Sequence, residues 1–157
     1  MAGFRKAEPK QAALKMGFYG PPGSGKTFTA LLVAEGLAKV TGRRIAYVDT
    51  ERGTDFYSQP VSARQVHPEA FDFDALYPRS MTEISGAVKE LDPKRYCCVV
   101  IDSMTHVWEA AQAAYSGGRN KNDSIPLAAW GRIKKPYKDL MAYLLSSPMH
   151  AIICGRQ

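Results

Sequence analysis

The sequence predicts an α/β fold, a three-layer αβα sandwich around a mainly parallel sheet of about five strands. Short apolar runs alternate along the 157 residues with longer stretches in which apolar residues recur at helical spacing. Several of the short runs are apolar at almost every position, as in strands that helices cover on both faces. Parallel strands joined by right-handed helical crossovers account for both observations.

In the first half of the chain, a strand is predicted over residues 14–19, and a helix from Lys26 to a stop at Gly42. A second strand covers 45–49. Glycine and proline residues interrupt 50–68, which indicates a loop with room for one helical turn. The helix is expected to bury one apolar side, made of Phe28, Leu31, Leu32, Ala34, Leu37, Ala38 and Val40.

Residues 71–76 alternate apolar and polar side chains, which predicts a short, half-exposed strand. Ser80 then opens a helix that runs through Leu91. Residues 96–102 form the most apolar strand of the chain, and helical spacing follows it to about Tyr115.

Residues 116–126 are polar and rich in glycine, so they are predicted to form a loop. A long helix is predicted over 127–146, and Pro136 is expected to kink it or to split it in two. The last strand is predicted over 150–154. On the helix over 127–146, the side chains expected to face inward are Trp130, Ile133, Tyr137, Leu140, Met141 and Leu144.

Length and composition predict one globular core, residues 14–157, after a basic N-terminal lead-in of residues 1–13. The apolar share of 45% and the charged share of 23% are ordinary for such a protein. No apolar run approaches the roughly 18 residues that cross a bilayer, and no apolar signal core follows the N-terminus. We therefore expect a cytoplasmic protein without a membrane partner.

The net charge of +6 favours polyanionic partners, but the basic residues are spread along the chain. Charge alone fits a solvated surface as well as a nucleic-acid track. Three cysteines, at positions 97, 98 and 154, lie in apolar runs without the spacing of a metal or redox motif. We expect them to be buried small hydrophobic side chains.

The strongest signal is a phosphate-binding loop between the first strand and the first helix. Its glycines allow the backbone to approach a polyphosphate closely, and its N–H groups and the following helix N-terminus favour anions. The lysine is expected to reach the β- and γ-phosphates, and the threonine hydroxyl to contact Mg²⁺. The eight residues match the pattern GxxxxGK[ST] and are Gly20, Pro21, Pro22, Gly23, Ser24, Gly25, Lys26 and Thr27. The loop predicts a nucleoside triphosphate site.

Three residues at the ends of other predicted strands are expected to complete this site, because ligands of parallel sheets bind off the carboxyl ends of the strands. Asp102 would hold Mg²⁺ directly or through water, and Glu51 would orient or deprotonate the attacking water. Arg156 would sense the γ-phosphate and stabilise its charge in the transition state. Asp49 could contribute to the outer shell of the metal or only close its strand.

Taken together, the motifs GPPGSGKT, YVDTE, VVIDS with THVWEA, and AWGRIKKPYKDL leading to HAIICGR resemble a known family. They are similar to the minimal RecA-like P-loop ATPases encoded by bacteriophages, AAA-family nucleotide-binding proteins related to the RecA/Rad51 recombinases. The resemblance covers roughly residues 10–157. It implies a RecA-like fold, ATP and Mg²⁺ as ligands, and ATP hydrolysis on single-stranded DNA in phage recombination or annealing.

Further roles follow from this resemblance. It makes Glu51 the catalytic glutamate, places Asp55 and Tyr57 at the adenine, and makes 116–126 the first DNA-binding loop. In that loop the implied DNA contacts are Arg119, Lys121 and Asn122. It further implies a homo-oligomer formed through the nucleotide face, in the cytoplasm of a bacterial host.

The chain stops at Gln157, where a second DNA-binding loop and further strands would follow in the family. We therefore expect a core that is truncated at its C-terminal end. Two other functions are compatible with the phosphate-binding loop. One is a kinase of a nucleoside or another small molecule, which usually needs a lid with several arginines. The other is a non-catalytic nucleotide switch. Such a switch would lack an acid that activates water, so the presence of Glu51 disfavours it.

Overall fold

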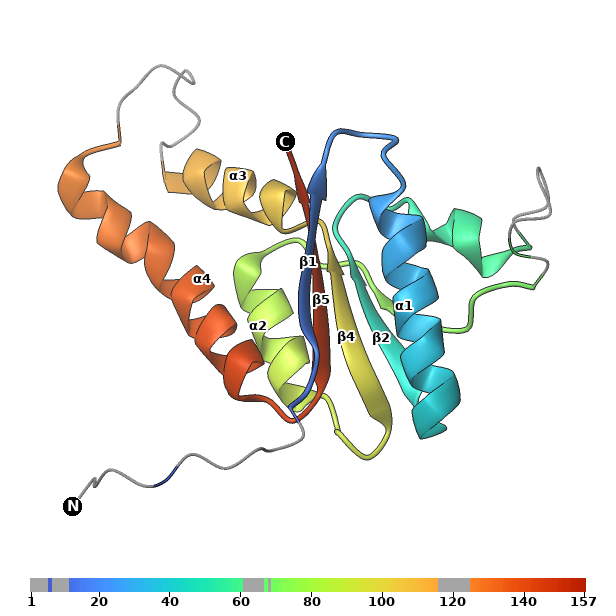
Figure 1. Ribbon diagram of the computed structural model, residues 1–157. Coiled ribbons are helices and arrows are strands. Elements are labelled where there is room, and N and C mark those ends of the chain that lie inside the picture. The colour runs from blue at the N-terminus through green and yellow to red at the C-terminus, as the bar shows by residue number, and fades with distance from the viewer. Residues whose placement is uncertain (1–5, 7–11, 61–66, 68, 116–124) are drawn as a thin grey trace.

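The structure is a computed structural model that describes residues 6, 12–60, 67, 69–115 and 125–157 (Figure 1). Its five-stranded sheet has the order β1-β5-β4-β2-β3, and all four strand pairs are parallel. The predicted α/β fold with about five parallel strands is therefore confirmed. The strands are β1 (Lys15–Gly20), β2 (Arg44–Asp49), β3 (Asp74–Leu76), β4 (Tyr96–Asp102) and β5 (His150–Arg156).

Helices cover both faces of the sheet, which gives the three predicted layers. In Figure 1, α1 lies on one face, and α2, α3 and α4 lie on the other. The helices are α1 (Lys26–Thr41), α2 (Met81–Glu90), α3 (Met104–Tyr115) and α4 (Leu127–Ser146), with a short 3₁₀ helix η1 (Thr54–Ser58) after β2. None of the helices in this described part of the chain is long and apolar enough to cross a membrane.

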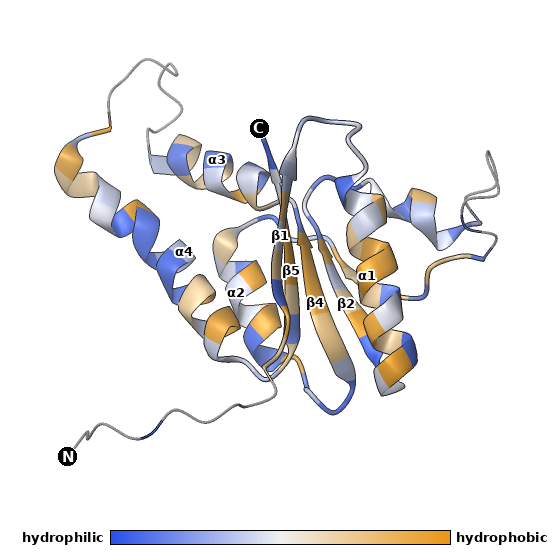
Figure 2. Cartoon of the chain, viewed as in Figure 1, coloured by the Kyte–Doolittle hydropathy of each residue, from blue (hydrophilic) through white to orange (hydrophobic). Residues whose placement is uncertain are grey.

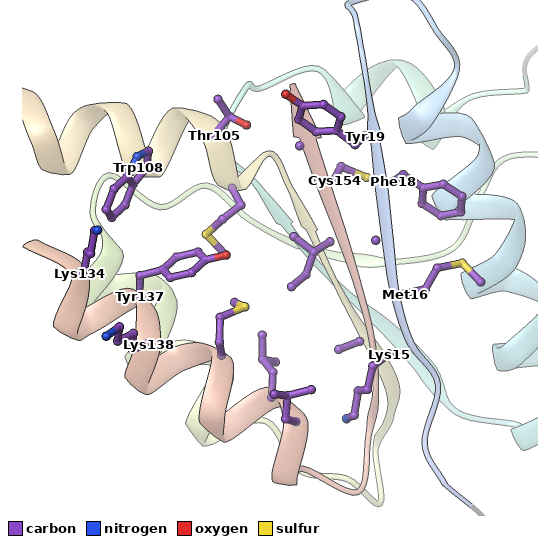
Figure 3. Close-up of a pocket in the computed structure, with 18 residues that line it drawn as sticks. Lys15, Met16, Phe18, Tyr19, Thr105, Trp108, Lys134, Tyr137, Lys138 and Cys154 are labelled. Atoms are coloured by element: carbon purple, nitrogen blue, oxygen red, sulfur yellow. The ribbon is translucent and has the colours of Figure 1, made fainter. Parts of the chain in front are cut away.

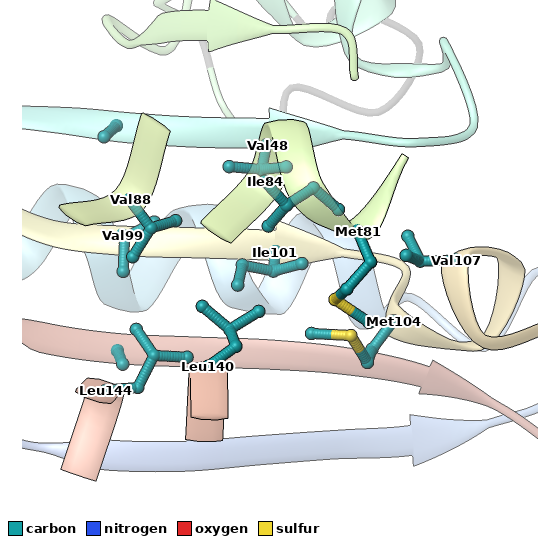
Figure 4. Packing of buried hydrophobic residues seen from close by; sticks show 12 residues of the cluster. Val48, Met81, Ile84, Val88, Val99, Ile101, Met104, Val107, Leu140 and Leu144 are labelled. Carbon is teal, nitrogen blue, oxygen red and sulfur yellow. The ribbon is translucent and has the colours of Figure 1, made fainter. Parts of the chain in front are cut away.

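Alternation along the central strands builds two separate hydrophobic cores. One cluster joins Val99 and Ile101 of β4 to Ile84 of α2 and Leu140 of α4, all of them nearly or fully buried (Figure 4). The opposite face of β4 packs through Val100 against α1. Because successive strand side chains point to opposite faces, an almost continuously apolar strand is needed to serve both cores. Figure 2 shows this concentration of hydrophobic residues in β4 and β2.

Helix ends follow the local signals in the sequence. Gly42 has a φ of 65°, and its N–H donates to the carbonyl of Ala38 at 2.8 Å, so α1 ends in a left-handed cap. The Ser80 side chain accepts a hydrogen bond from the Glu83 N–H at 3.2 Å and caps α2.

Three expectations about the helices and the last strand were wrong. On α1, Leu32 and Val40 are 40% and 87% exposed. The helix carries more apolar residues than fit on the side that packs against the sheet. The helix α4 runs unbroken through Pro136, so the expected split is wrong, while the alternative of a kink stays a prediction. Strand β5 extends two residues past Cys154, because β1 continues to pair with it up to Arg156.

The described residues pair β1 with β5 only, which makes β1 an edge of the sheet. All three cysteines are free and buried, as expected, with Cys97 and Cys98 in β4 and Cys154 in β5. The loop with the GxxxxGK[ST] motif follows this edge strand.

Candidate nucleotide site

The parallel sheet brings four strand ends to the same rim. In register, Gly20 at the end of β1 pairs with Arg156 of β5, and Asp49 of β2 pairs with Asp102 of β4. Figure 1 shows the loop after β1 and the C-terminal end of β5 at this rim. Segments that lie more than 100 residues apart in sequence are therefore neighbours here.

The loop between β1 and α1 has the conformation that its glycines permit. Gly23 and Gly25 have φ angles of 76° and 83°, a region that residues with a Cβ rarely adopt. Gly25 is also the N-cap of α1, so the positive end of this helix faces the loop. The Lys26 ammonium donates to the carbonyls of Gly20 and Pro21, both at 2.8 Å. It is thus folded over the loop that would hold the phosphates.

A pocket of about 200 Å³ lies at the mouth of this loop. It brings together Lys26 and Thr27 of the loop with three residues predicted from distant segments, Glu51, Asp102 and Arg156. The full lining is Pro22, Gly23, Gly25, Lys26, Thr27, Glu51, Tyr57, Asp102 and Arg156. The mainly polar lining and the ammonium suit a polyanionic ligand.

Asp102 is nearly buried, and its Oδ2 atom accepts two hydrogen bonds. One comes from the Thr27 hydroxyl at 2.6 Å, and the other from the Tyr47 hydroxyl at 2.9 Å. Burial, followed by the charge of Asp102, raises the pKa of Tyr47 far above its ordinary value, so this hydroxyl keeps its proton. The hydroxyl of Thr27 and the carboxylate of Asp102 are hard oxygen donors, which fits Mg²⁺.

Glu51 forms an ion pair with Arg156, whose guanidinium contacts its Oε2 atom. The other carboxylate oxygen, Oε1, is buried without a hydrogen-bond partner among the described residues. Nδ1 of His106 lies 3.8 Å from Oε1. An unpaired buried acceptor is costly, so this oxygen is suited to accept a hydrogen bond from a ligand or a water in the pocket.

Asp49 closes its strand. Its Oδ1 atom accepts the backbone N–H groups of Glu51 and Arg52 at 2.8 and 2.7 Å. Its Oδ2 atom accepts from Thr54, through both the backbone N–H and the hydroxyl. Of the two readings that the sequence left open, these bonds favour the structural one. They fix the turn that carries Glu51 to the pocket.

Of the two residues expected near the adenine, only Tyr57 lines the pocket. Tyr57 lines the pocket and belongs to an aromatic group with Phe28 and Phe71, at ring-centroid distances of 6.3 Å from each. Asp55 does not line the pocket; its carboxylate is exposed and accepts a hydrogen bond from the Tyr77 hydroxyl. The predicted DNA contacts Arg119, Lys121 and Asn122 lie outside the described residues.

Sequence reasoning missed several residues that hold the site together. Tyr47 supports Asp102, and the Thr105 hydroxyl accepts the backbone N–H of Arg156 at 2.9 Å. Thr50 spans β2 and β4: its backbone N–H donates to the Asp102 carbonyl at 2.8 Å, and its hydroxyl to the Ser103 carbonyl at 2.9 Å. The one available signal was Tyr47, because a tyrosine in a buried strand needs a partner for its hydroxyl.

A second, larger cavity was not predicted. This apolar groove of about 850 Å³ lies between β1 and β5 on one side and α3 and α4 on the other. Figure 3 shows Trp108 and Tyr137 facing it from the helices, with Lys15 and Tyr19 on β1. It lies apart from the phosphate loop, since Lys26, Glu51 and Asp102 do not line it.

Two comparisons with known proteins agree with this geometry. The sequence profile of the AAA domain family matches residues 12–157. The chain is also similar to the DNA repair and recombination protein RadB of Methanosphaera stadtmanae, with 32% identity over 102 residues. That match covers 58% of this chain and 41% of the RadB chain, so it spans less than half of this relative. Both findings support a P-loop protein of the RecA type.

Proposed function

The chain belongs to the AAA domain family, and from this we propose that it binds ATP with Mg²⁺ and hydrolyses it as a RecA-like ATPase. We further propose that it acts on single-stranded DNA in phage recombination or annealing. The observation that carries the ATPase proposal is the pocket that gathers Lys26, Glu51, Asp102 and Arg156 from four separate segments.

The loop and α1 would bind the triphosphate. The ammonium of Lys26, now bonded to the carbonyls of Gly20 and Pro21, would transfer to phosphate oxygens, which are stronger acceptors. Thr27 and Asp102 would hold Mg²⁺, which neutralises phosphate charge and favours displacement at the γ-phosphorus. Hydrolysis then needs a placed water and a group that takes its proton.

Glu51 is the candidate for that group. The water oxygen would form a bond to the γ-phosphorus while the bond to the oxygen that bridges to the β-phosphate breaks, which leaves ADP. The proton of the water would pass to Glu51. Its unpaired Oε1 supports this role, because this atom has acceptor capacity left inside the site. Arg156 would move from Glu51 to the γ-phosphate and stabilise its charge.

The proposed action on DNA is supported more indirectly. The relative RadB is named a DNA repair and recombination protein, and this chain carries a net charge of +6. Single-stranded DNA is bound through backbone charge, so a basic protein of this family suits it. Arg119 and Lys121 are the proposed contacts.

The ATPase proposal is tested with Glu51→Gln, which keeps the size of the side chain and removes its basicity. We expect ATP turnover to fall by at least roughly 100-fold while ATP affinity stays within about threefold of wild type. Glu90→Gln, at the exposed end of α2, is the matched control and should retain wild-type turnover. Wild-type turnover in Glu51→Gln would remove the assigned role of this residue.

The DNA proposal is tested by turnover and binding with and without single-stranded DNA over a range of salt concentrations. We expect DNA to stimulate turnover. Each of Arg119→Ala and Lys121→Ala should reduce the slope of log affinity against log salt concentration by about 1, the loss of one phosphate contact. Lys94→Ala, exposed at the opposite end of the sheet, is the control. A protein that binds no DNA even at low salt would exclude this role.

A further inference from the structure

We propose that Tyr47 is a positioning residue for the Mg²⁺ site, acting through Asp102. Its hydroxyl donates to the same carboxylate oxygen, Oδ2, that accepts the Thr27 hydroxyl. This inference rests on the proposed function, since it concerns how the proposed nucleotide site presents its two oxygen ligands.

The position of Tyr47 in the sheet explains the contact. Tyr47 pairs in register with Val100 on the neighbouring strand β4, and Asp102 lies two residues further along that strand. Residues two apart on a strand share a face, so Tyr47 and Asp102 lie diagonally on the α1 side of the sheet. A long aromatic side chain spans such a diagonal, and the two oxygen atoms are 2.9 Å apart.

Tyr47 is held firmly enough to orient its partner. The residue is 1% exposed, and its ring packs against Phe73 at a centroid distance of 5.3 Å. Asp102 is itself 6% exposed, so a change in its orientation would leave polar atoms without solvent to replace a lost bond. The buried ring therefore fixes the hydroxyl, and the hydroxyl restrains the rotation of the carboxylate.

This restraint acts on both proposed metal ligands. Two donors converge on Oδ2, so Oδ1 would be the oxygen of Asp102 that holds a cation. The Thr27 hydroxyl gives its hydrogen to Oδ2, so its lone pairs remain free to face the metal. Partners behind metal ligands commonly change metal affinity by about 10–100-fold when they are removed.

The test is Tyr47→Phe, which removes only the hydroxyl and keeps the packing of the ring. Binding of a fluorescent ATP analogue is measured in a Mg²⁺ titration and, separately, in excess EDTA. We expect the Mg²⁺ concentration for half-maximal enhancement of binding to rise at least about tenfold, and the affinity in EDTA to stay within about twofold. A second measurement uses Asp102→Asn, in which the further effect of Tyr47→Phe should disappear.

Tyr96→Phe is the matched control. The Tyr96 hydroxyl also donates to an aspartate in the same sheet, Asp74, at 2.8 Å, but it lies at the opposite end of the strands. This variant should leave the Mg²⁺ titration unchanged. Thermal melting of all variants shows whether each is folded.

The outcomes separate the two proposals. A wild-type protein whose nucleotide binding does not respond to Mg²⁺ would contradict the proposed function itself. If wild type responds and Tyr47→Phe titrates identically, the positioning role is wrong. An equal loss of affinity with Mg²⁺ and in EDTA would overturn it as well, because it would show a general packing effect. So would an undiminished effect of Tyr47→Phe in the Asp102→Asn background.

Discussion

Arg156, the last residue of β5, forms an ion pair with Glu51, which lies 105 residues earlier in the sequence. Arg156, the proposed γ-phosphate sensor, is thus paired in this structure with Glu51, the proposed catalytic base. A triphosphate in the pocket would compete for the guanidinium, because phosphate oxygens are strong bidentate acceptors for arginine. With ATP bound as proposed, breaking this pair would release the Glu51 carboxylate as the phosphate site is filled.

Replacing Arg156 by Ala should slow ATP turnover by about 100-fold or more, since removal of one donor to developing charge has this effect in other enzymes. Turnover is measured at saturating ATP, with binding measured separately. The control is Arg79→Ala, an exposed arginine just before α2. A variant with unchanged turnover would show that Arg156 does not act on the reacting phosphate.

Tyr57 should contribute to ATP affinity through its ring, because it lines the pocket beside the phosphate loop. Tyr57→Ala should weaken ATP binding by roughly 1–3 kcal/mol, a common range for stacking of a base on an aromatic ring. Tyr57→Phe should bind as wild type does. Equal affinity for ATP in the alanine variant, measured by calorimetry, would place the adenine elsewhere.

His150 predicts a loss of stability as the solution becomes acidic. Its Nδ1 atom accepts the backbone N–H of Leu14 at 2.7 Å, which requires a neutral ring. Burial, together with the charges of Arg43 and Lys15, lowers the pKa of His150 below its ordinary value of 6.5. The unfolded chain therefore binds the proton more readily, so this stability is complete above about pH 6.5 and is lost as the pH falls below it.

The measurement is the melting temperature between about pH 7.5 and pH 5, above the range in which ordinary carboxylates titrate. In His150→Asn, an amide oxygen can accept the Leu14 N–H without titrating, so the decrease over this range should be smaller than in wild type. An identical decrease in both proteins would assign it to other groups.

Leu140 should be a main contributor to the core between the sheet and α4. It is fully buried, so Leu140→Ala should lower the free energy of unfolding by about 2–5 kcal/mol. Leu145 on the same helix is 70% exposed, and Leu145→Ala should change it by less than about 0.5 kcal/mol. Urea unfolding of both variants measures the difference, and similar values would contradict the described packing of α4.

Much of the fold could be predicted because local signals were strong. The strand over 96–102 and the helix from Met104 to Tyr115 have the predicted ends, and Ser80 and Gly42 cap their helices as their chemistry suggests. Errors arose where the structure depends on packing against residues that are distant in the sequence. The exposure of Val40 depends on what α1 packs against, and the unbroken helix at Pro136 depends on packing that propensity does not include.

The site was predictable at the level of strand ends but not of contacts. The phosphate loop is a contiguous motif, and parallel strands bring Glu51, Asp102 and Arg156 to one rim. The partner of each side chain is set by the register between strands, which the sequence does not state locally. The bond of Tyr47 to Asp102 depends on such a register, across 55 residues.

The pairing of β1 with β5 also has a consequence for biosynthesis. Within the described residues, the strand that carries the phosphate loop is bonded only to residues 151–156, which come after every other strand and helix of the fold. A nascent chain that still lacks this segment has no partner for β1, and contacts between such distant segments form slowly. We therefore expect nucleotide binding to begin only after residues 151–156 have left the ribosome, and ATP retention on stalled chains of increasing length would time that event.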